Sequence, residues 1–582
     1  MKKIFILIII ANCAFSWTSH AQFNASFEGN GQWYSELSGS GAPGSSNDDS
    51  TRFRSNAYLK LDYAVQNWDF GLQIESYLPK ALLNYSPELD GVNIGTIHAR
   101  YYNAAIGLDI TGGHLYEQFG NGLIFRTWED RQLGINNAIL GGRVAYTPVS
   151  WATLTALAGK QRIGMGFDLS KGTLFGANLD ISVTDMLSVG NYTIDAGFSY
   201  IGRHEETPEE DPTAFVPNPV DPTAPKMVNA YSGRINFAVK GFYLGGEYVF
   251  KGKDVAVETD FDPHPELYTG QALFINFGYS QKGLGIDVNL RRLENMKFYS
   301  QRDVSGNQYN TAILNYLPAL TKQYDYSLQN IYVYQAQSSL MFMSWPPKAG
   351  EIGGQMDVIY EFAKGTAIGG KYGMNIAVNA SYWSALQSTF DATDMTYTAD
   401  FLGFGDKLYH DIGVEVRRKC SDSWSFIAMY LNQFYNEGYL EKADAKITAN
   451  TFSGEATFKF GKAQAVKLEL QHQWGVKVRQ ELTGTGGYRD VSDSKNWWGA
   501  GVEYTLNHHW SVYVNDMYNY QGKEDDKNYR THYYNAGITF VQRATRIALG
   551  FGRQRGGLLC VGGVCRQVPE ATGLTLNITT SF

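Results

Sequence analysis

The sequence predicts an all-β protein: a single large antiparallel transmembrane β-barrel of about 24 to 26 strands, with short periplasmic turns and long extracellular loops. Three observations predict this fold class. Apolar and polar residues alternate in segments of about ten residues, the length at which a tilted strand crosses a bilayer. These segments continue from near Phe23 to the last residue. The connections between them are alternately short and long, as in outer-membrane barrels.

The composition is unusual for a soluble multidomain chain. The 582 residues include 39 Tyr, 32 Phe and 12 Trp, while only 18% of the residues are charged. The net charge of −8 is mild and no basic patch or tail accompanies it, so we expect no nucleic-acid partner. The chain is also neither acidic nor repetitive enough for intrinsic disorder.

The N-terminus has the order of a secretory signal peptide. Two lysines precede an apolar run, and the tripeptide Ser-His-Ala that ends at Ala21 supplies a cleavage site. Residues 1–21 would then be the signal peptide and residues 22–582 the outer-membrane barrel. An alternative is a lipoprotein signal with Cys13 as the acylated residue, but Asn12 is a bulky polar residue where a small one is preferred.

Period-two alternation identifies the strands that follow. The segment AYLKLDY places Leu59 and Leu61 on one face, and Lys60 and Asp62 on the other. The same pattern recurs in WDFGLQIE, TIDAGFSY, LGIDVNLR and AVKLELQH. A soluble β-sandwich would bury the apolar face, whereas a membrane barrel turns it to lipid and lines a wet interior with the polar face. The strand length and the continuity of the pattern favour the barrel.

The strand count is ambiguous at one place. About 25 segments alternate, but a bacterial single-chain barrel has an even number of strands. The stretch from Tyr324 to Trp345 gives 26 strands if it is divided in two, and 24 strands if it is a loop. We favour 26.

Tryptophan follows four of the short turns closely, at Trp68, Trp151, Trp424 and Trp510. Barrels carry girdles of aromatic residues at the membrane interfaces, so we predict that these four belong to a periplasmic aromatic belt. The alternative is that each tryptophan is an ordinary strand residue with no role in a belt. The last segment, LTLNITTSF, alternates and ends at Phe582, which is typical of the signal that the barrel-assembly machinery recognises.

One long connection is too apolar for a free external loop. The stretch YEQFGNGLIFRTWEDRQLGINN has an apolar centre among charged residues, and an unplugged barrel of this size would leave a wide hole. We predict that it folds inward as a constriction loop; the alternative is a loop lying over the rim. The stretch at 309–323 has the same character. The candidate constriction residues are Glu117, Arg126, Trp128, Glu129 and Arg131.

Two cysteines flank a Gly-Gly pair in the stretch GRQRGGLLCVGGVCR. A metal site would need two further ligands, and a redox pair is usually Cys-x-x-Cys. Gly562 and Gly563 suit a two-residue turn, which places Cys560 and Cys565 opposite each other within disulfide range. We therefore predict a disulfide at the external tip of the final hairpin. Cys420 is left unpaired, with no role that the sequence defines.

Four stretches together resemble an uncharacterised family of Gram-negative outer-membrane β-barrel proteins. They are GRQRGGLLCVGGVCR with TGLTLNITTSF, YEQFGNGLIFRTWEDRQLG, NYLPALTKQ and GEIGGQMDVIYEF. The resemblance covers the whole mature chain. It implies a membrane location and a barrel fold, and it implies no activity for particular residues.

The sequence contains no catalytic constellation. It has no Gly-x-Ser-x-Gly motif and its ten histidines are scattered, so we expect no enzyme, no catalytic or metal-binding residue and no cofactor. Strand-building begins almost at once, which leaves no room for an N-terminal plug domain.

Two functions remain. The first is a porin-like channel for small hydrophilic solutes with inward-folded loops. The second is a non-conducting barrel that acts as a subunit or scaffold of a larger outer-membrane complex, for protein export or barrel assembly, and would bind other outer-membrane proteins. In either case we expect an integral protein of the cell outer membrane, surrounded by its lipid and inserted by the barrel-assembly machinery.

Overall fold

A computed structural model describes residues 21–37, 51–83, 86, 88–206, 224–257, 263–302, 312–342, 346–441, 445–482, 488–521 and 530–582. The expected signal peptide therefore lies outside the described residues except for Ala21, as does Cys13 of the alternative lipoprotein signal.

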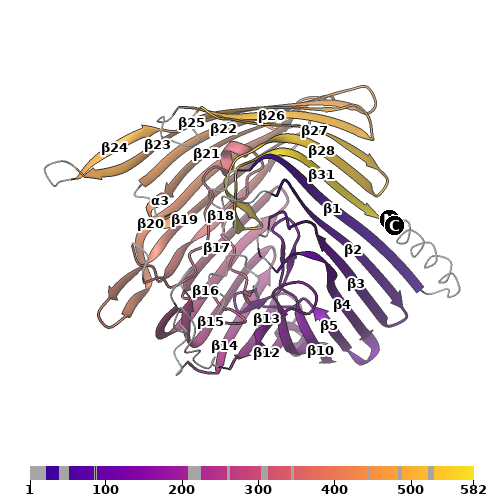
Figure 1. The fold of residues 1–582 in the computed structure, drawn as a ribbon, viewed down its shortest axis with the longest axis vertical. Helices are drawn as coiled ribbons and strands as arrows, with labels where there is room; N and C mark the ends of the chain where they lie inside the picture. Colours follow the sequence, from indigo (N-terminus) through magenta and orange to yellow (C-terminus); the bar gives the residue numbers. More distant parts are fainter. Residues whose placement is uncertain are drawn as a thin grey trace.

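The described strands form one closed antiparallel barrel of 24 strands. The first strand, β1 (Ala21–Leu37), pairs with β2 (Phe53–Val65) on one side and with the last strand, β31 (Ala571–Ser581), on the other. This pairing closes the sheet, and Figure 1 shows β1 in indigo beside β31 in yellow. The predicted fold class is therefore confirmed.

The other strands of the wall follow in chain order between β2 and β31, each paired with its neighbours. They are β3 (Trp68–Tyr77), β4 (Gly91–Asn103), β5 (Leu108–Leu115), β10 (Ile139–Val149), β11 (Ala152–Arg162), β12 (Leu169–Ser182), β13 (Thr193–His204), β14 (Met227–Val239), β15 (Phe242–Val257), β16 (Pro263–Gln281), β17 (Leu284–Glu294), β18 (Gly350–Phe362), β19 (Met374–Asp391), β20 (Thr396–Lys419), β21 (Trp424–Asn436), β22 (Ala445–Phe460), β23 (Gln464–Leu482), β25 (Asn496–Thr505), β26 (Trp510–Gln521), β27 (His532–Gln542) and β28 (Thr545–Gln554).

One further strand of the sheet lies outside the wall. β24 (Tyr488–Ser494) pairs only with the far end of β23, from Val476 to Leu482, and projects beyond the rim as a hairpin (Figure 1). The preference for 26 strands was wrong. The described part of the 324–345 stretch adds no strand to the wall, because its large side chains, Tyr324, Tyr326, Leu328 and Tyr334, are buried inside the barrel.

Helices are few and short in the described chain. They are η1 (Ala104–Ile106), α2 (Val183–Leu187), η2 (Ser327–Asn330) and α3 (Glu437–Leu440). None of the helices in the described ranges has the length and hydropathy that a membrane span requires.

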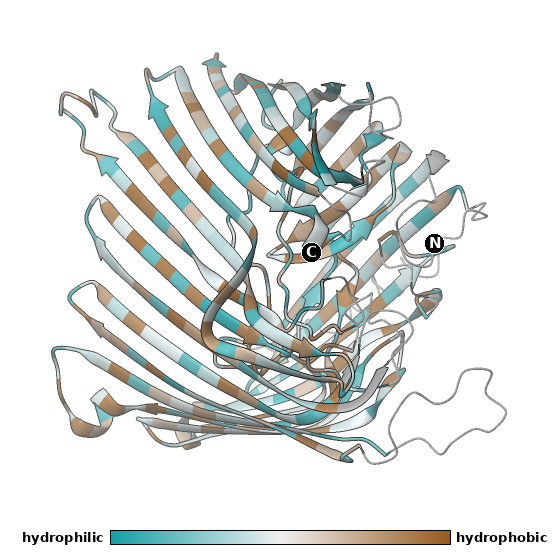
Figure 2. Ribbon diagram, turned by 90° about the vertical axis from the view of Figure 1, so that its left-hand side faces the viewer, coloured by the Kyte–Doolittle hydropathy of each residue, from teal (hydrophilic) through white to brown (hydrophobic). Residues whose placement is uncertain are grey.

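Alternation along the strands gives the barrel an apolar outer face, visible in Figure 2 as brown bands between teal ones. On β31, for example, Leu574 and Leu576 are each 41% exposed and point outward, while Thr575 between them points into the lumen. Some outward-pointing residues on other strands are more exposed still: Leu470 is 67% exposed and Val514 is 60% exposed. Apolar surface of this extent on every side is stable only against lipid or another apolar medium.

The two ends of the barrel differ in their connections. Two-residue turns join β2 to β3, β14 to β15 and β16 to β17 at one end, and we call this the short-turn end. Gln66 and Lys240, in two of these turns, adopt the positive φ that such tight turns need. The longest connections, such as 116–138, lie at the other end, which we call the long-loop end.

Three chain segments from the long-loop end enter the lumen and together form what we call the plug: residues 116–138, residues 295–342 in their described parts, and residues 555–570. The first contains β6 (Gln118–Phe119), β7 (Phe125–Arg126), β8 (Glu129–Asp130) and β9 (Ile135–Asn136). The third is a separate hairpin of β29 (Gly557–Val561) and β30 (Val564–Val568).

Candidate functional site

The plug has its own hydrophobic core against the barrel wall. Phe119, Leu123 and Phe125 of the first segment and Phe298 and Leu314 of the second are buried together. They pack on inward-facing apolar residues near the long-loop ends of successive strands, namely Leu157, Leu174, Ile201, Val249, Ala272 and Leu293. The hydrophobic effect therefore holds these segments inside the lumen.

These inward apolar residues are the part of the site that the sequence reasoning missed. They occupy the face of each strand that carries polar residues elsewhere, so the barrel was expected to have a polar interior throughout. The signal was present in the sequence. Apolar residues in the inward register, confined to the long-loop end of several consecutive strands, indicate a segment packed inside.

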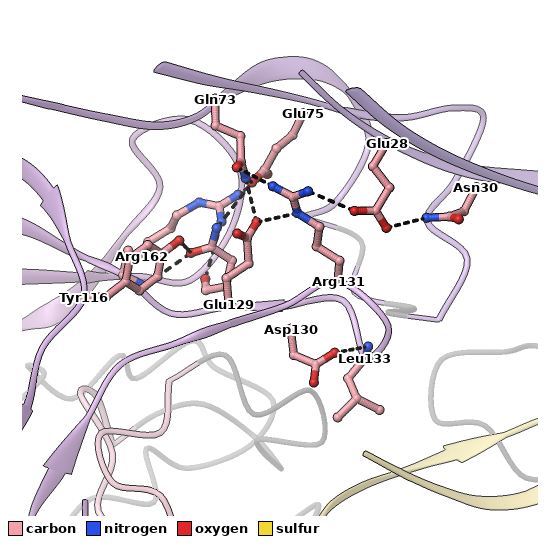
Figure 3. A network of polar contacts seen from close by, with 12 residues as sticks. Glu28, Asn30, Gln73, Glu75, Tyr116, Glu129, Asp130, Arg131, Leu133 and Arg162 are labelled. Atoms are coloured by element: carbon pink, nitrogen blue, oxygen red, sulfur yellow. Dashed lines mark hydrogen bonds and ion pairs between the residues drawn. The ribbon is translucent and has the colours of Figure 1, made fainter. Parts of the chain in front are cut away.

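A network of buried and half-buried polar side chains fixes the first segment to the wall (Figure 3). Arg131 donates hydrogen bonds to Glu28 of β1 at 2.9 Å and to Gln73 of β3 at 2.8 Å, while Glu129 accepts one from Gln73 at 2.6 Å. Beside them Glu75 and Arg162, both fully buried, form an ion pair. A buried charge is tolerated only when it is paired in this way.

The five candidate constriction residues do not form one ring. Glu129 and Arg131 lie together in the network of Figure 3. Arg126 and Trp128 meet at the ring of Tyr316, where the guanidinium carbon lies 4.0 Å from the ring centroid and the indole centroid 5.1 Å from it. Glu117 lies apart from both pairs and binds Arg143 of the wall. All five therefore anchor the first segment.

The second segment is hydrogen-bonded to the first. The Asn315 side-chain amide donates to the carbonyl oxygen of Leu123 at 3.0 Å and to that of Met296 at 2.7 Å. Asn137 of the first segment and Gln161 of the wall both donate to the carbonyl of Ile313, at 3.2 Å and 2.7 Å. The two segments therefore behave as one packed unit.

Farther along, two buried carboxylates of the wall hold the second segment. Glu351 of β18 accepts hydrogen bonds from Tyr334 at 2.6 Å and from the Gln337 backbone N–H at 2.6 Å, and it pairs with Arg291 at 2.7 Å. Asp411 of β20 accepts a hydrogen bond from the Tyr324 hydroxyl at 2.9 Å. Burial raises the pKa of Tyr324 well above its usual value, so this phenol keeps its proton.

The predicted disulfide between Cys560 and Cys565 is present, with 4.0 Å between their Cα atoms. Gly562 and Gly563 form the two-residue turn, with φ values of 57° and 80°. The expected external position was wrong, because the turn packs onto the second plug segment. The backbone N–H of Ala319 donates to the Gly563 carbonyl at 2.9 Å, and a Cβ atom at 563 would lie 2.7 Å from the Ala319 carbonyl oxygen.

We expect the disulfide to contribute little to the barrel itself. The two cysteines are only five positions apart, so loop-closure entropy gives about 2 kcal/mol, which is small beside a fully paired wall. Replacing both cysteines with serine should leave membrane insertion intact and increase trypsin cleavage at Arg555 and Arg566. Mass spectrometry of non-reduced peptides tests the bond, and free thiols at both positions would contradict it.

The four belt candidates all lie at the short-turn end. Trp68, Trp424 and Trp510 are the first residues of β3, β21 and β26, and Trp151 directly precedes β11. Each of the first three packs on neighbouring rings, Trp510 for example on Phe540 with centroids 4.6 Å apart.

The C-terminal Phe582 and the free cysteine also lie outside the plug. Phe582 is 77% exposed, and its backbone N–H donates to the Ala25 carbonyl at 2.8 Å. Cys420 is a free thiol that directly follows β20. No group of three His, Cys, Asp or Glu side chains in the described chain is placed to hold a metal ion.

A cavity of about 480 Å³ remains between the plug and one arc of the wall. The arc consists of β26, β27, β28, β31 and β1, and it contributes Asn515, Asn535, Gly552, Thr575 and Gln32. The plug side contributes residues from 319–334 and from the disulfide hairpin. The plug therefore leaves a space along this side of the lumen.

The short-turn half of the lumen contains charges of both signs, several of them paired between strands that are adjacent or one strand apart. Arg100 of β4 pairs with Asp109 of β5 at 2.8 Å, Arg234 of β14 pairs with Asp180, and Lys467 of β23 pairs with Glu503 at 3.2 Å. Paired charges of this kind keep the interior wet without producing a field of one sign.

No curated protein matches this chain by sequence. Among solved structures, it is similar to the P pilus usher (PapC) translocation pore, at 8% identity and a TM-score of 0.44, with 96% of this chain and 99% of that chain covered. The siderophore receptor PirA from Pseudomonas aeruginosa matches at 8% identity and 0.37, covering 96% and 80%. The outer membrane protein opdK from Pseudomonas aeruginosa matches at 10% and 0.34, covering 81% and 99%.

The sequence of residues 1–582 also matches one family along its full length. This agrees with the resemblance that the sequence motifs indicated. The chain belongs to DUF6029, a family described as being of unknown function.

Proposed function

We propose that the protein is a porin-like channel of the outer membrane, in which small hydrophilic solutes pass beside the plug. The observation that carries this proposal is the cavity of about 480 Å³ between the plug and the β26–β1 arc. Ligand-sized spaces in proteins fall in this range, and this one is lined largely by uncharged polar side chains and glycines.

The arc is suited to a passage because some of the residues with which it lines the cavity are glycines. Gly537 and Gly550 lie beneath the ring of Tyr513, whose hydroxyl donates to Asn535 at 3.3 Å, and Thr575 continues the same face. The opposite arc is occupied by the plug core. Solutes would therefore cross the lumen off its axis, between the plug and the last strands of the barrel.

In this proposal the five candidate constriction residues act as anchors of the plug, so they restrict the lumen by holding the first segment in place. The apolar outer face supports the membrane location, and the short-turn end is assigned to the periplasm with its tryptophans at the lipid interface. Phe582, exposed at the end of β31, is available to the assembly machinery.

Conductance tests the passage. Thr575→Trp places a large ring in the cavity and should lower single-channel conductance in planar bilayers by about two-fold or more, because a pore's conductance depends on its narrowest diameter. Thr579→Trp is the matched control, since Thr579 also points inward on β31 but lies outside the cavity lining. Equal conductance of both variants and the unmodified protein would contradict an off-axis passage.

One observation favours a second function. The plug has the packed core of a stable domain, which also suits a non-conducting barrel that serves as a subunit of a larger outer-membrane complex. Silent bilayers from folded protein, together with stoichiometric partners after affinity purification from native membranes, would support that role. Neither function assigns a catalytic step to the chain.

A further inference from the structure

We propose that the cavity beside the plug binds small organic anions that carry a carboxylate or a phosphate, with Arg555 as the central binding group. The proposal rests on the channel function in one respect, since it names the solutes that the passage would favour. The binding itself does not require conduction, and the two can be tested separately.

The charged side chains that line the cavity are all of one sign. Lys322, Arg553 and Arg555 are its charged lining residues, and no Asp or Glu of the described chain lines it. This contrasts with the rest of the lumen, where both signs occur, and with the whole chain, whose net charge is −8. A local excess of positive charge in a low-dielectric enclosure attracts anions.

Two of the three cations already have carboxylate neighbours. The Arg553 Nε donates to Glu570 at 2.7 Å, and the Lys322 ammonium lies 3.8 Å from a carboxylate oxygen of Glu415. Both cations therefore add to the positive electrostatic potential of the cavity, but their carboxylate partners leave neither of them fully available to a ligand. Their partners also hold the two side chains in position beside the third cation.

Arg555 is different. It directly follows β28, and its hydrogen bond in the described structure is a long one of 3.4 Å, to the backbone carbonyl of Ile331. No carboxylate of the described residues lies within 4.0 Å of its guanidinium group. Desolvation lowers the pKa of Arg555, and the opposing effect of Glu441 and of nearby tyrosines offsets this only in part. An anion in the cavity would compensate the charge of Arg555.

The neighbours of Arg555 suit an anion with polar substituents. A guanidinium presents two parallel N–H groups, a geometry that matches a carboxylate or a phosphate. Thr321, Asn515, Gln554 and Thr575 lie along the same cavity and can hydrogen-bond hydroxyl groups. The volume of about 480 Å³ accommodates a molecule of monosaccharide size.

Titration of the folded, full-length mature barrel in detergent tests the site, with gluconate, glucose 6-phosphate and neutral glucose as probes. Gluconate and glucose 6-phosphate should bind and glucose should not. Arg555→Gln should weaken anion binding about ten-fold or more, because it removes a charge-assisted hydrogen-bond pair. Arg543→Gln is the matched control, since Arg543 is exposed in the turn between β27 and β28.

Three outcomes would overturn the proposal: equal binding of glucose and the two anions, no binding of either anion, or unchanged anion binding by Arg555→Gln. The disulfide and heat-modified migration serve as checks that each variant is folded. Arg555→Lys keeps the positive charge but loses the two parallel N–H donors of the guanidinium. This variant should bind the anions more weakly than the unmodified protein and more tightly than Arg555→Gln.

Reversal potentials in planar bilayers separate this proposal from the channel function. The unmodified protein should prefer chloride over potassium, and Arg555→Glu should reduce or invert that preference. Silent bilayers with anion binding intact in detergent would remove the channel function and leave the site. Conducting channels that show neither anion preference nor anion binding would remove the site and leave the channel.

Discussion

Replacing residues 118–133 with a short Gly-Ser linker is expected to increase single-channel conductance several-fold. The replacement removes Phe119, Leu123 and Phe125 from the core between the plug and the wall. It also removes the Leu123 carbonyl that Asn315 binds, so the second segment loses one of its attachments. The lumen of a 24-stranded barrel is wide once it is unplugged.

Planar-bilayer recording measures this effect. The control is a barrel in which the tip of the projecting hairpin, residues 480–490, is replaced by the same linker, because from residue 480 onward β23 pairs with β24 and no longer with β22. Its conductance should match that of the unmodified protein. If the shortened plug gives the same conductance as the control, residues 118–133 do not restrict the lumen.

Glu351→Leu is expected to release the second plug segment. Glu351 is fully buried and accepts hydrogen bonds from Tyr334 and Gln337, and it neutralises the buried Arg291. Removing one partner of a buried ion pair costs about 3–5 kcal/mol, since the remaining charge has no counter-ion. That cost falls on the packing of the plug, which is attached less strongly than the paired strands, so trypsin should reach Lys322 in the folded barrel.

Limited proteolysis followed by mass spectrometry measures the release. Glu503→Leu is the matched control. Glu503 pairs with Lys467 at 3.2 Å, but both side chains are about 40% exposed, and an exposed pair contributes only about 0–1 kcal/mol. This control should keep the cleavage pattern of the unmodified protein. Identical patterns for the two variants would show that Glu351 does not hold the plug.

The barrel wall could be predicted from the sequence because the alternation of apolar and polar residues is a local pattern. Each strand alternates within about ten residues, so a stretch such as 574–582 shows both of its faces without reference to the rest of the chain. The disulfide could be predicted for the same reason, since Gly562 and Gly563 determine the turn that brings Cys560 and Cys565 together.

The plug could be predicted only in part. Its first segment was found by its apolar character, but the partners of Glu129 and Arg131 come from β1 and β3, and no local pattern relates them. The segment that begins at Tyr324 resembled strands because its aromatic residues are spaced like those of a strand. Inside the lumen those residues meet different parts of the wall, with Tyr324 on β20 and Leu328 on β23 and β25.

The pairing of β1 with β31 has a consequence for biogenesis. The seam joins residues more than 500 positions apart, as in the hydrogen bond from Ser35 to the Thr572 carbonyl, so it forms only after the last eleven-residue strand is available. Directly before that strand, the disulfide hairpin docks on the second plug segment, and the first segment is tied to β1 through Arg131 and Glu28. Both sides of the seam thus carry contacts to the plug, so closing the wall and filling the interior are coupled.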